Sequence, residues 1–220
     1  MIHTNFLDYS IHVRAIVATV ILSGLVFWGA AQDALGVSIW QTRYKADGIL
    51  VQTHPKENSA IPVFRAEIEI EANVNNVLAI IADPAKCSRW LYQCVEARTL
   101  RFVGSSEKYV YQVNELPWPL KNRDLVLSII IEKAAPNQFR IRLVNKPNEI
   151  PEDQYIRIRE FEGDYLLTGL SATRTKVEWE QHVEPGGEIP SMVIETMLTE
   201  IPVNSLKQLR KLAAELTTER

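Results

Sequence analysis

A series of short strand patterns occupies most of the chain and constrains its fold more than any other feature. From residue 95 onward, turn residues separate these segments, and no connection is long enough to hold a crossover helix. We expect strands at residues 49–53, 63–72, 95–103, 108–114, 124–133, 138–145, 155–168 and 173–183, with a bulge at Gly163. Strands joined by such short connections predict an antiparallel meander.

Two short helical pieces are expected between residues 73 and 92. Asn73 suits the N-cap of a helix that carries Val77 and Ile81. This helix should end near Asp83, because the residue before a proline disfavours the helical region. A second helical or irregular piece would carry residues 87–92.

The C-terminal segment has the pattern of one long amphipathic helix that begins near Pro190. Its apolar positions recur at three- and four-residue steps and include Ile194, Met197, Leu198, Ile201, Leu209, Leu212 and Leu216. Pro202 falls inside the helix, so we expect a kink or a short interruption near Glu200 and Ile201. The inner face of the sheet is the large hydrophobic partner available to this stripe. The sequence therefore predicts an α+β fold in which a curved antiparallel sheet wraps around a long C-terminal helix.

An uncharged apolar run at residues 15–31 follows Arg14. As a helix it would rise about 25 Å, at the lower limit for a hydrocarbon core of roughly 30 Å. Gly29 and Ala31 offer a cleavage site before Gln32, as in a signal peptide. Residues 1–31 are therefore either a cleaved signal peptide or an uncleaved membrane anchor, and residues 32–220 form one domain. Both interpretations predict a protein that is exported, to the periplasm of a bacterial host, or tethered to the membrane through residues 15–31.

Two cysteines, Cys87 and Cys94, flank Trp90. Export would allow a disulfide bond between them. On one continuous helix, however, their Cα atoms would lie about 10 Å apart, beyond the limit of roughly 7 Å for such a bond. Either the helix breaks between them and the bond forms, or both are small buried hydrophobes.

Charge and residue distribution exclude several classes of function. The net charge of −3 comes from 24 basic and 27 acidic residues that are mixed along the chain, so we expect no nucleic-acid partner. The dispersed histidines and two cysteines lack zinc-ligand spacing, and the chain has no GxSxG elbow, phosphate loop or dinucleotide fingerprint. His182 is expected to be a solvated residue on the polar face of its strand. We therefore expect no catalytic residue, metal or cofactor.

Three segments, in this order and spacing, resemble the START (steroidogenic acute regulatory protein-related lipid-transfer) family. They are DPAKCSRW at 83–90, LPWPLKNRDLV at 116–126 and VEPGGEIPS at 183–191. The resemblance covers nearly all of residues 40–212 and implies the helix-grip fold, with a cavity for a lipid or another hydrophobic molecule. The motif residues are Trp90, Arg123, Asp124, Gly186, Gly187 and Pro190. Arg123 and Asp124 are expected to pair with neighbouring charges at the rim, with direct ligand contact as the alternative.

The resemblance implies which side chains line the cavity. They are Val110, Gln112, Leu125, Leu127, Ile129 and Trp179 on the sheet, and Met197, Leu198 and Ile201 on the helix. A solid core filled by the same side chains is the alternative.

The chain departs from the better-known family members at their polar ligand contacts. Cys87 stands where phosphatidylcholine-transfer members have an arginine, and Gln112 and Leu125 occupy two positions of their choline cage. Val110 and Ile129 stand where sterol-binding members have a buried acid and an arginine. The pocket is therefore expected to be more apolar than either type.

These observations favour a non-enzymatic binder or carrier of a lipid, with a membrane surface as a partner. The loop at residues 147–153 and the helix at Pro202 are candidates to open, because an enclosed ligand needs a path out. One alternative is an enzyme similar to polyketide cyclases or hydrolases on the same fold, which a buried ionisable group at the cavity wall would favour. The other is a membrane-anchored protein-interaction module, which a core without a cavity would favour.

Overall fold

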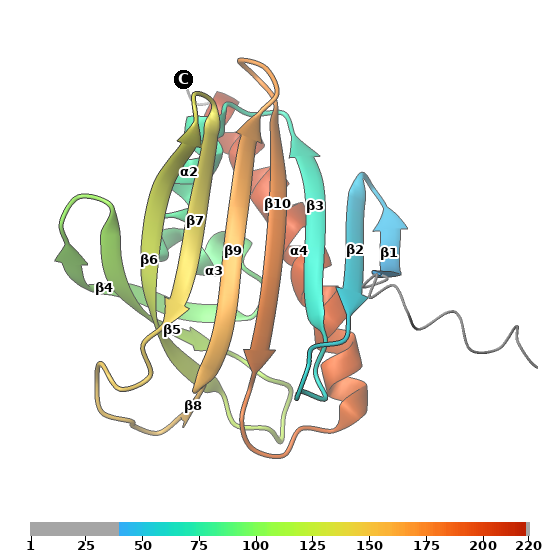
Figure 1. Cartoon of the computed structure of the whole chain (residues 1–220), viewed down its shortest axis with the longest axis vertical. Coiled ribbons are helices and arrows are strands. Elements are labelled where there is room, and N and C mark those ends of the chain that lie inside the picture. The colour runs from blue at the N-terminus through green and yellow to red at the C-terminus, as the bar shows by residue number, and fades with distance from the viewer. Residues whose placement is uncertain (1–39, 219–220) are drawn as a thin grey trace, which may run out of the picture. The chain divides into compact units, whose positions relative to one another are not determined.

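Ten strands form one curved sheet in residues 40–218, the part of the chain that this computed structural model describes (Figure 1). The strands are β1 (Gln41–Ala46), β2 (Ile49–His54), β3 (Val63–Ile70), β4 (Cys94–Val103), β5 (Glu107–Asn114), β6 (Arg123–Ala135), β7 (Gln138–Asn145), β8 (Ile156–Arg157), β9 (Glu160–Gly169) and β10 (Thr175–Glu184). Their order across the sheet is β1-β2-β3-β10-β9-β7-β6-β5-β4, and β8 pairs with β6 at the side of this path. The expected signal or anchor segment, residues 15–31, and its cleavage site lie outside the described residues.

The pairing along this path is antiparallel, as the short connections predict. The exception is β8, which pairs parallel with the start of β6. The expected strand at residues 155–168 is therefore two strands, because the chain turns away from β6 before it joins β7 as β9.

The bulge expected at Gly163 is wrong. β9 pairs in regular register with both β10 and β7 through this glycine. A Cβ atom at this position would lie 3.0 Å from the ring of Phe161 and 3.4 Å from Leu143. The missing side chain of Gly163 thus leaves space for Phe161 and Leu143, and the strand has no bulge here. The register shifts occur instead in β1, twice in β4, and near the end of β6.

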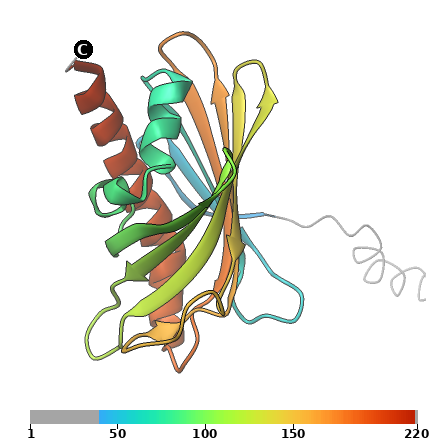
Figure 2. The same ribbon diagram turned by 90° about the vertical axis from the view of Figure 1, so that its left-hand side faces the viewer.

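Helices cover one face of the sheet: α2 (Val74–Ile81), α3 (Cys87–Trp90) and the long α4 (Ser191–Thr218) (Figure 2). The side chain of Asn73 caps α2 by accepting a hydrogen bond of 2.8 Å from the backbone N–H of Asn75, as expected. A short 3-10 turn, η1 (Pro84–Lys86), joins α2 to α3. α4 passes through Pro202 without the interruption that the sequence suggested. No helix within residues 40–218 is long and apolar enough to cross a membrane.

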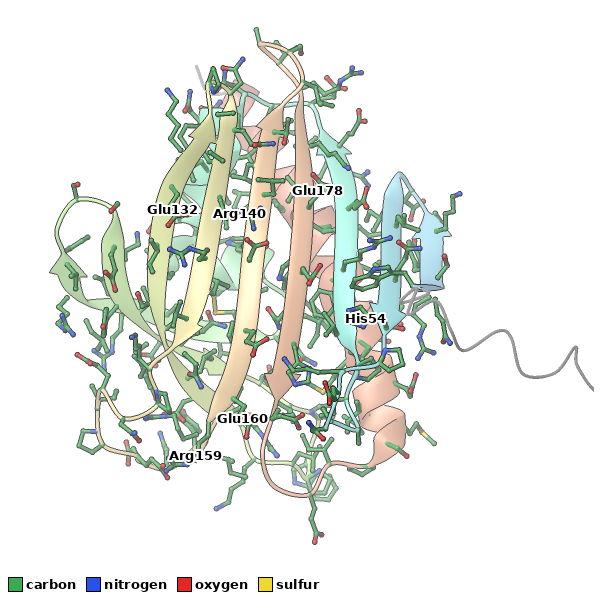
Figure 3. The ribbon with its side chains drawn as sticks, in the orientation of Figure 1. His54, Glu132, Arg140, Arg159, Glu160 and Glu178 are labelled. Carbon is green, nitrogen blue, oxygen red and sulfur yellow. A yellow bond between two sulfur atoms is a disulfide. The ribbon has the colours of Figure 1, made fainter. Side chains whose placement is uncertain are left out.

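The main core lies between the helices and the concave face of the sheet. It includes Ala66 and Ile68 of β3, Val77 of α2, and Leu206 and Leu209 of α4. The opposite face carries charged side chains such as Glu132, Arg140 and Glu178 (Figure 3). The predicted helix-grip fold, a curved sheet around a C-terminal helix, is confirmed.

Candidate ligand-binding cavity

A cavity of about 110 Å³ lies between the concave face of the sheet and helices α3 and α4. Among the nine residues expected to line it, eight do: Val110, Gln112, Leu125, Leu127, Ile129, Trp179, Met197 and Ile201. Leu198 lines instead a neighbouring pocket of about 30 Å³ with Phe64 and Ile194. The two pockets share Met197 and Ile201, so α4 borders both.

The sequence analysis missed part of the wall. α3 and its flanks add Cys87, Trp90 and Leu91, and strands β7 and β9 add Leu143, Phe161 and Tyr165. The strand residues could have been found, because Phe161 and Tyr165 lie an even number of positions apart and therefore share one face of β9. The contribution of α3 has no such signal, since it depends on where a four-residue helix packs.

Aromatic rings form one side of the cavity. The ring of Tyr165 stacks on Trp179 at 5.1 Å between centroids and meets Trp90 edge-on at 6.1 Å. Phe64 contacts the other side of Trp179 at 4.9 Å. Burial raises the pKa of the Tyr165 hydroxyl well above its usual value, so this group stays neutral.

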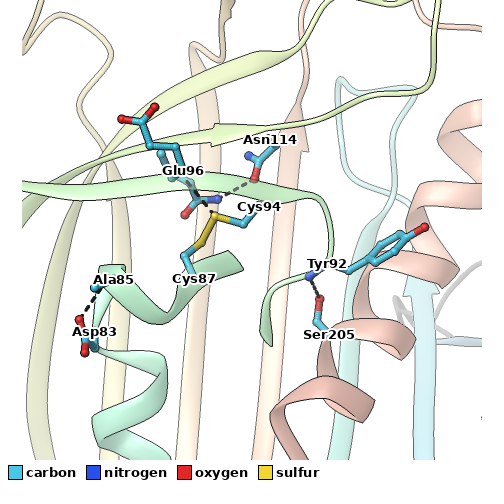
Figure 4. The surroundings of a disulfide bond; sticks show 9 residues. Asp83, Ala85, Cys87, Tyr92, Cys94, Glu96, Asn114 and Ser205 are labelled. Atoms are coloured by element: carbon cyan, nitrogen blue, oxygen red, sulfur yellow. Dashed lines mark hydrogen bonds between the residues drawn. A yellow bond between two sulfur atoms is a disulfide. The ribbon is translucent and has the colours of Figure 1, made fainter. Parts of the chain in front are cut away.

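A disulfide bond joins Cys87 to Cys94 at the edge of the cavity (Figure 4). The two Cα atoms are 5.9 Å apart because α3 ends at Trp90 and the chain turns back into β4. Of the two possibilities that the sequence left open, the helix therefore breaks between the cysteines and the disulfide bond forms. The next connection is to α4, where the hydroxyl of Ser205 accepts a hydrogen bond of 3.0 Å from the backbone N–H of Tyr92. The segment from α3 to β4 is thus fixed by the disulfide bond and by a hydrogen bond to α4.

Arg123 occupies the end of the cavity near the start of α4. It begins β6 and shares a face with Leu125, Leu127 and Ile129, so its side chain points to the concave side. The guanidinium donates to the backbone carbonyls of Lys121, Pro185 and Gly186. Gly186 and Gly187, in the turn before α4, both have φ of +67°, a backbone conformation that glycine adopts without strain. A side chain at Gly187 would lie 3.3 Å from Arg123 Nη2.

Comparison with known proteins agrees with this geometry. The family model for the START domain matches residues 34–219. The chain belongs to the START domain family. A protein of Pseudomonas aeruginosa described as "Uncharacterized protein PA1579" is 30% identical over 201 residues, which span 91% of this chain and 98% of that protein.

Two solved structures show the same fold. A fragment of the STAR-related lipid transfer protein from Xanthomonas axonopodis is 29% identical, with a TM-score of 0.73, covering 80% of this chain and 98% of that chain. Human StAR-related lipid transfer protein 5 is 14% identical, with a TM-score of 0.72, covering 94% of this chain and 97% of that chain. The second likeness shows the fold alone.

The expected pairing of Arg123 and Asp124 with neighbouring charges holds for Asp124 but not for Arg123. Asp124 pairs with Arg157, at 2.8 Å and fully buried, while Arg123 has no acidic partner within the described residues. Arg157 also donates to the carbonyls of Pro147, Ile150 and Pro151. The expected mobile loop at residues 147–153 is therefore tied down by three hydrogen bonds.

The expectation of a solvated His182 is wrong. The side chain does project from the polar face, but it is only 4% exposed. Its strand neighbour Glu162 and the side chain of Val63 flank it, and its Nε2 lies 3.2 Å from Glu184 Oε1. Neighbouring strands therefore cover a side chain that the alternation alone would leave in water.

The cavity wall offers little for catalysis. Among the described residues that line it, Asp83 is the one carboxylate. A hydrogen bond from Lys86 lowers the pKa of Asp83, and the backbone N–H of Ala85 also binds it. A carboxylate held in this way is a poor proton donor or acceptor at neutral pH. No cluster of three potential metal ligands occurs within residues 40–218.

Proposed function

We propose that this START domain binds a lipid or a similar hydrophobic molecule in its cavity and carries it without chemical change. The observation that supports the proposal is a cavity walled mainly by aliphatic and aromatic side chains, from Val110 and Leu127 to Trp179. Removing apolar surface from water gains roughly 25 cal/mol per Å², so such a wall favours an apolar ligand.

The size of the cavity limits what it holds in this closed form. Its volume of about 110 Å³ is below that of the engineered cavity of about 150 Å³ that binds benzene. A longer ligand therefore requires the wall to expand, and the mobile parts would be the segment before β6 and the start of α4.

Exposed apolar side chains support a membrane contact at this same end. Trp118, in the loop between β5 and β6, is 92% exposed, and Met192, in the first turn of α4, is 80% exposed. Arg123 links the two regions, because it binds both Lys121 and Gly186. Tryptophan favours the membrane–water interface, so a ligand would leave the cavity directly into lipid.

The protein is proposed to work outside the cytoplasm, as an exported or membrane-tethered carrier. The apolar run at residues 15–31 and the disulfide between Cys87 and Cys94 both support this location. Disulfide bonds persist in oxidising compartments and are rare in the cytosol.

Extraction and mass spectrometry of molecules that copurify with the full chain test the proposal. Two variants on β7 add a specific control: Leu143 lines the cavity, whereas Val144 lies on the opposite face of the same strand. Leu143→Trp is expected to fill the cavity and remove the copurifying molecule, and Val144→Trp is expected to retain it. Absence of any bound or acquired lipid in the unaltered protein would overturn the proposal.

A further inference from the structure

Arg123 is a buried charge without a counter-charge. Its side chain is 1% exposed, and it is the one cationic residue among the described residues that line the cavity. Burial lowers its pKa, and no carboxylate acts in the opposite direction. A buried charge without a partner is expensive, so its presence requires an explanation.

Another buried arginine, Arg157, has a carboxylate as its partner. Arg157 forms two hydrogen bonds with the carboxylate of Asp124, at 3.0 and 2.8 Å, and they raise its pKa. Arg123 begins the same strand that carries Asp124, but the alternation of β6 sends the two side chains to opposite faces. Asp124 therefore pairs with Arg157 rather than with Arg123.

The hydrogen bonds of Arg123 leave donors free. A guanidinium has five N–H groups, and those of Arg123 make three bonds, to the carbonyls of Lys121, Pro185 and Gly186. One N–H on Nη1 and one on Nη2 remain. These carbonyls fix the position of the guanidinium without neutralising its charge.

Polar side chains gather at the Arg123 end of the cavity, whereas the part of β6 farther from it presents an apolar wall. Asn114 is paired with Arg123 across β5 and β6, and Gln112 donates a hydrogen bond of 2.9 Å to the side-chain oxygen of Asn114. All three side chains line the cavity. Farther along β6 the wall is Leu125, Leu127 and Ile129.

We propose that the Arg123 end of the cavity binds the carboxylate of a ligand whose hydrocarbon chain lies along the apolar wall of β6. This inference rests on the proposed function and names the chemical class of the ligand, a single-chain organic acid such as a fatty acid. One cation matches one negative charge, and two free N–H groups on neighbouring nitrogens match the two oxygens of a carboxylate. Asn114 is the cross-strand neighbour of Arg123, and with Gln112 it supplies amide groups on the same wall of the cavity.

A matched pair of ligands tests this on the unaltered full chain. Dodecanoate and its methyl ester share the same chain and differ in charge, and each would displace the neutral fluorescent probe N-phenyl-1-naphthylamine at pH 7.5. We expect dodecanoate to bind tighter than the ester by about tenfold or more, the usual effect of a charge-assisted hydrogen bond in a buried site. Equal affinities would overturn the carboxylate site and leave the proposed function intact. If neither ligand displaces the probe, the carboxylate site also fails, and the copurification experiment alone then decides the proposed function.

Two substitutions test whether Arg123 is the residue that binds the carboxylate. Arg123→Gln is expected to bring the affinities for dodecanoate and the ester together, mainly by weakening dodecanoate. Arg159→Gln is the control, because Arg159 is exposed at the same end and pairs with Glu152 rather than lining the cavity. A preference for dodecanoate that survives in Arg123→Gln, or that disappears in Arg159→Gln, would overturn the assignment. The ligand pair on the unaltered chain keeps the test valid if Arg123→Gln does not fold.

Discussion

At the scale of single residues, the buried pair of Asp124 and Arg157 does structural work that can be measured. Asp124→Asn should lower the free energy of unfolding by about 3–5 kcal/mol, because it leaves the Arg157 charge buried without a partner. The half-exposed pair of Arg140 and Asp164 provides the matched control, and Asp164→Asn should cost no more than about 1 kcal/mol. Urea denaturation measures both, and equal losses in the two variants would contradict the assignment.

Tyr111 lies beside this pair and should make stability depend on pH. Burial, and then the nearby charge of Asp124, raise the pKa of Tyr111 to about 12 from its ordinary value of 10. Because the folded state favours the neutral phenol, this contribution is fully present below pH 10 and is lost as pH rises through 12.

The difference in unfolding free energy between the unaltered protein and Tyr111→Phe isolates this effect. This difference should be constant below pH 10 and should fall by about 2–3 kcal/mol in total as the pH rises from 10 to 12. Denaturation curves at a series of pH values measure it. A difference that does not change with pH would show that Tyr111 titrates normally.

The sequence predicts where a residue lies on its strand better than it predicts which side chains the residue contacts. Arg123 and Asp124 were correctly placed at a strand start and were both expected to pair with neighbouring charges. Because neighbouring residues on a strand point to opposite faces, Asp124 meets Arg157, whereas Arg123 meets backbone carbonyls. His182 was placed on the polar face and is nevertheless buried. Both outcomes depend on side chains from distant segments, which strand alternation does not encode.

At the scale of elements, the disulfide fixes α3 against β4. The bond closes a short loop, since the two cysteines are separated by seven positions. The chain-entropy model gives about 2–3 kcal/mol for a loop of this length. Replacing both cysteines by alanine should lower the free energy of unfolding by that amount, measured by urea denaturation without reductant. Dithiothreitol should destabilise the unaltered protein similarly and leave the double variant unchanged; an equal effect on both would contradict this role.

The elements that the sequence predicted are those with one buried face. Strand β3 and helix α4 have clear periodicity because each packs one side on the core. Strand β1 was not identified, since it lies at the edge of the sheet and its side chains are mostly exposed. The break between β8 and β9 was also missed, because it depends on pairing with β6 rather than on local composition.

At the scale of the whole molecule, the fold was predictable and the cavity only in part. The order of strands and the C-terminal helix, together with three motif segments, were enough to identify the family and the helix-grip architecture. Eight of nine expected lining residues face the space, because alternation determines the concave side of each strand. The positions of α3 and Leu198 depend on how the helices pack against the concave face of the sheet, and no local sequence pattern predicts this packing.

The end of the domain that holds Arg123 should also be the end that meets a membrane. Replacing both Trp118 and Met192 by serine should weaken cosedimentation with vesicles and slow the exchange of a bound ligand into them. Affinity for the ligand in solution should not change, because neither exposed side chain closes the apolar wall. Phe102 offers the control: it is 73% exposed, but it lies near the turn between β4 and β5, at the opposite end of β5 from Asn114. If Phe102→Ser weakens vesicle binding as much as the double variant does, the membrane contact is not at the Arg123 end, and the ligand must leave by another route.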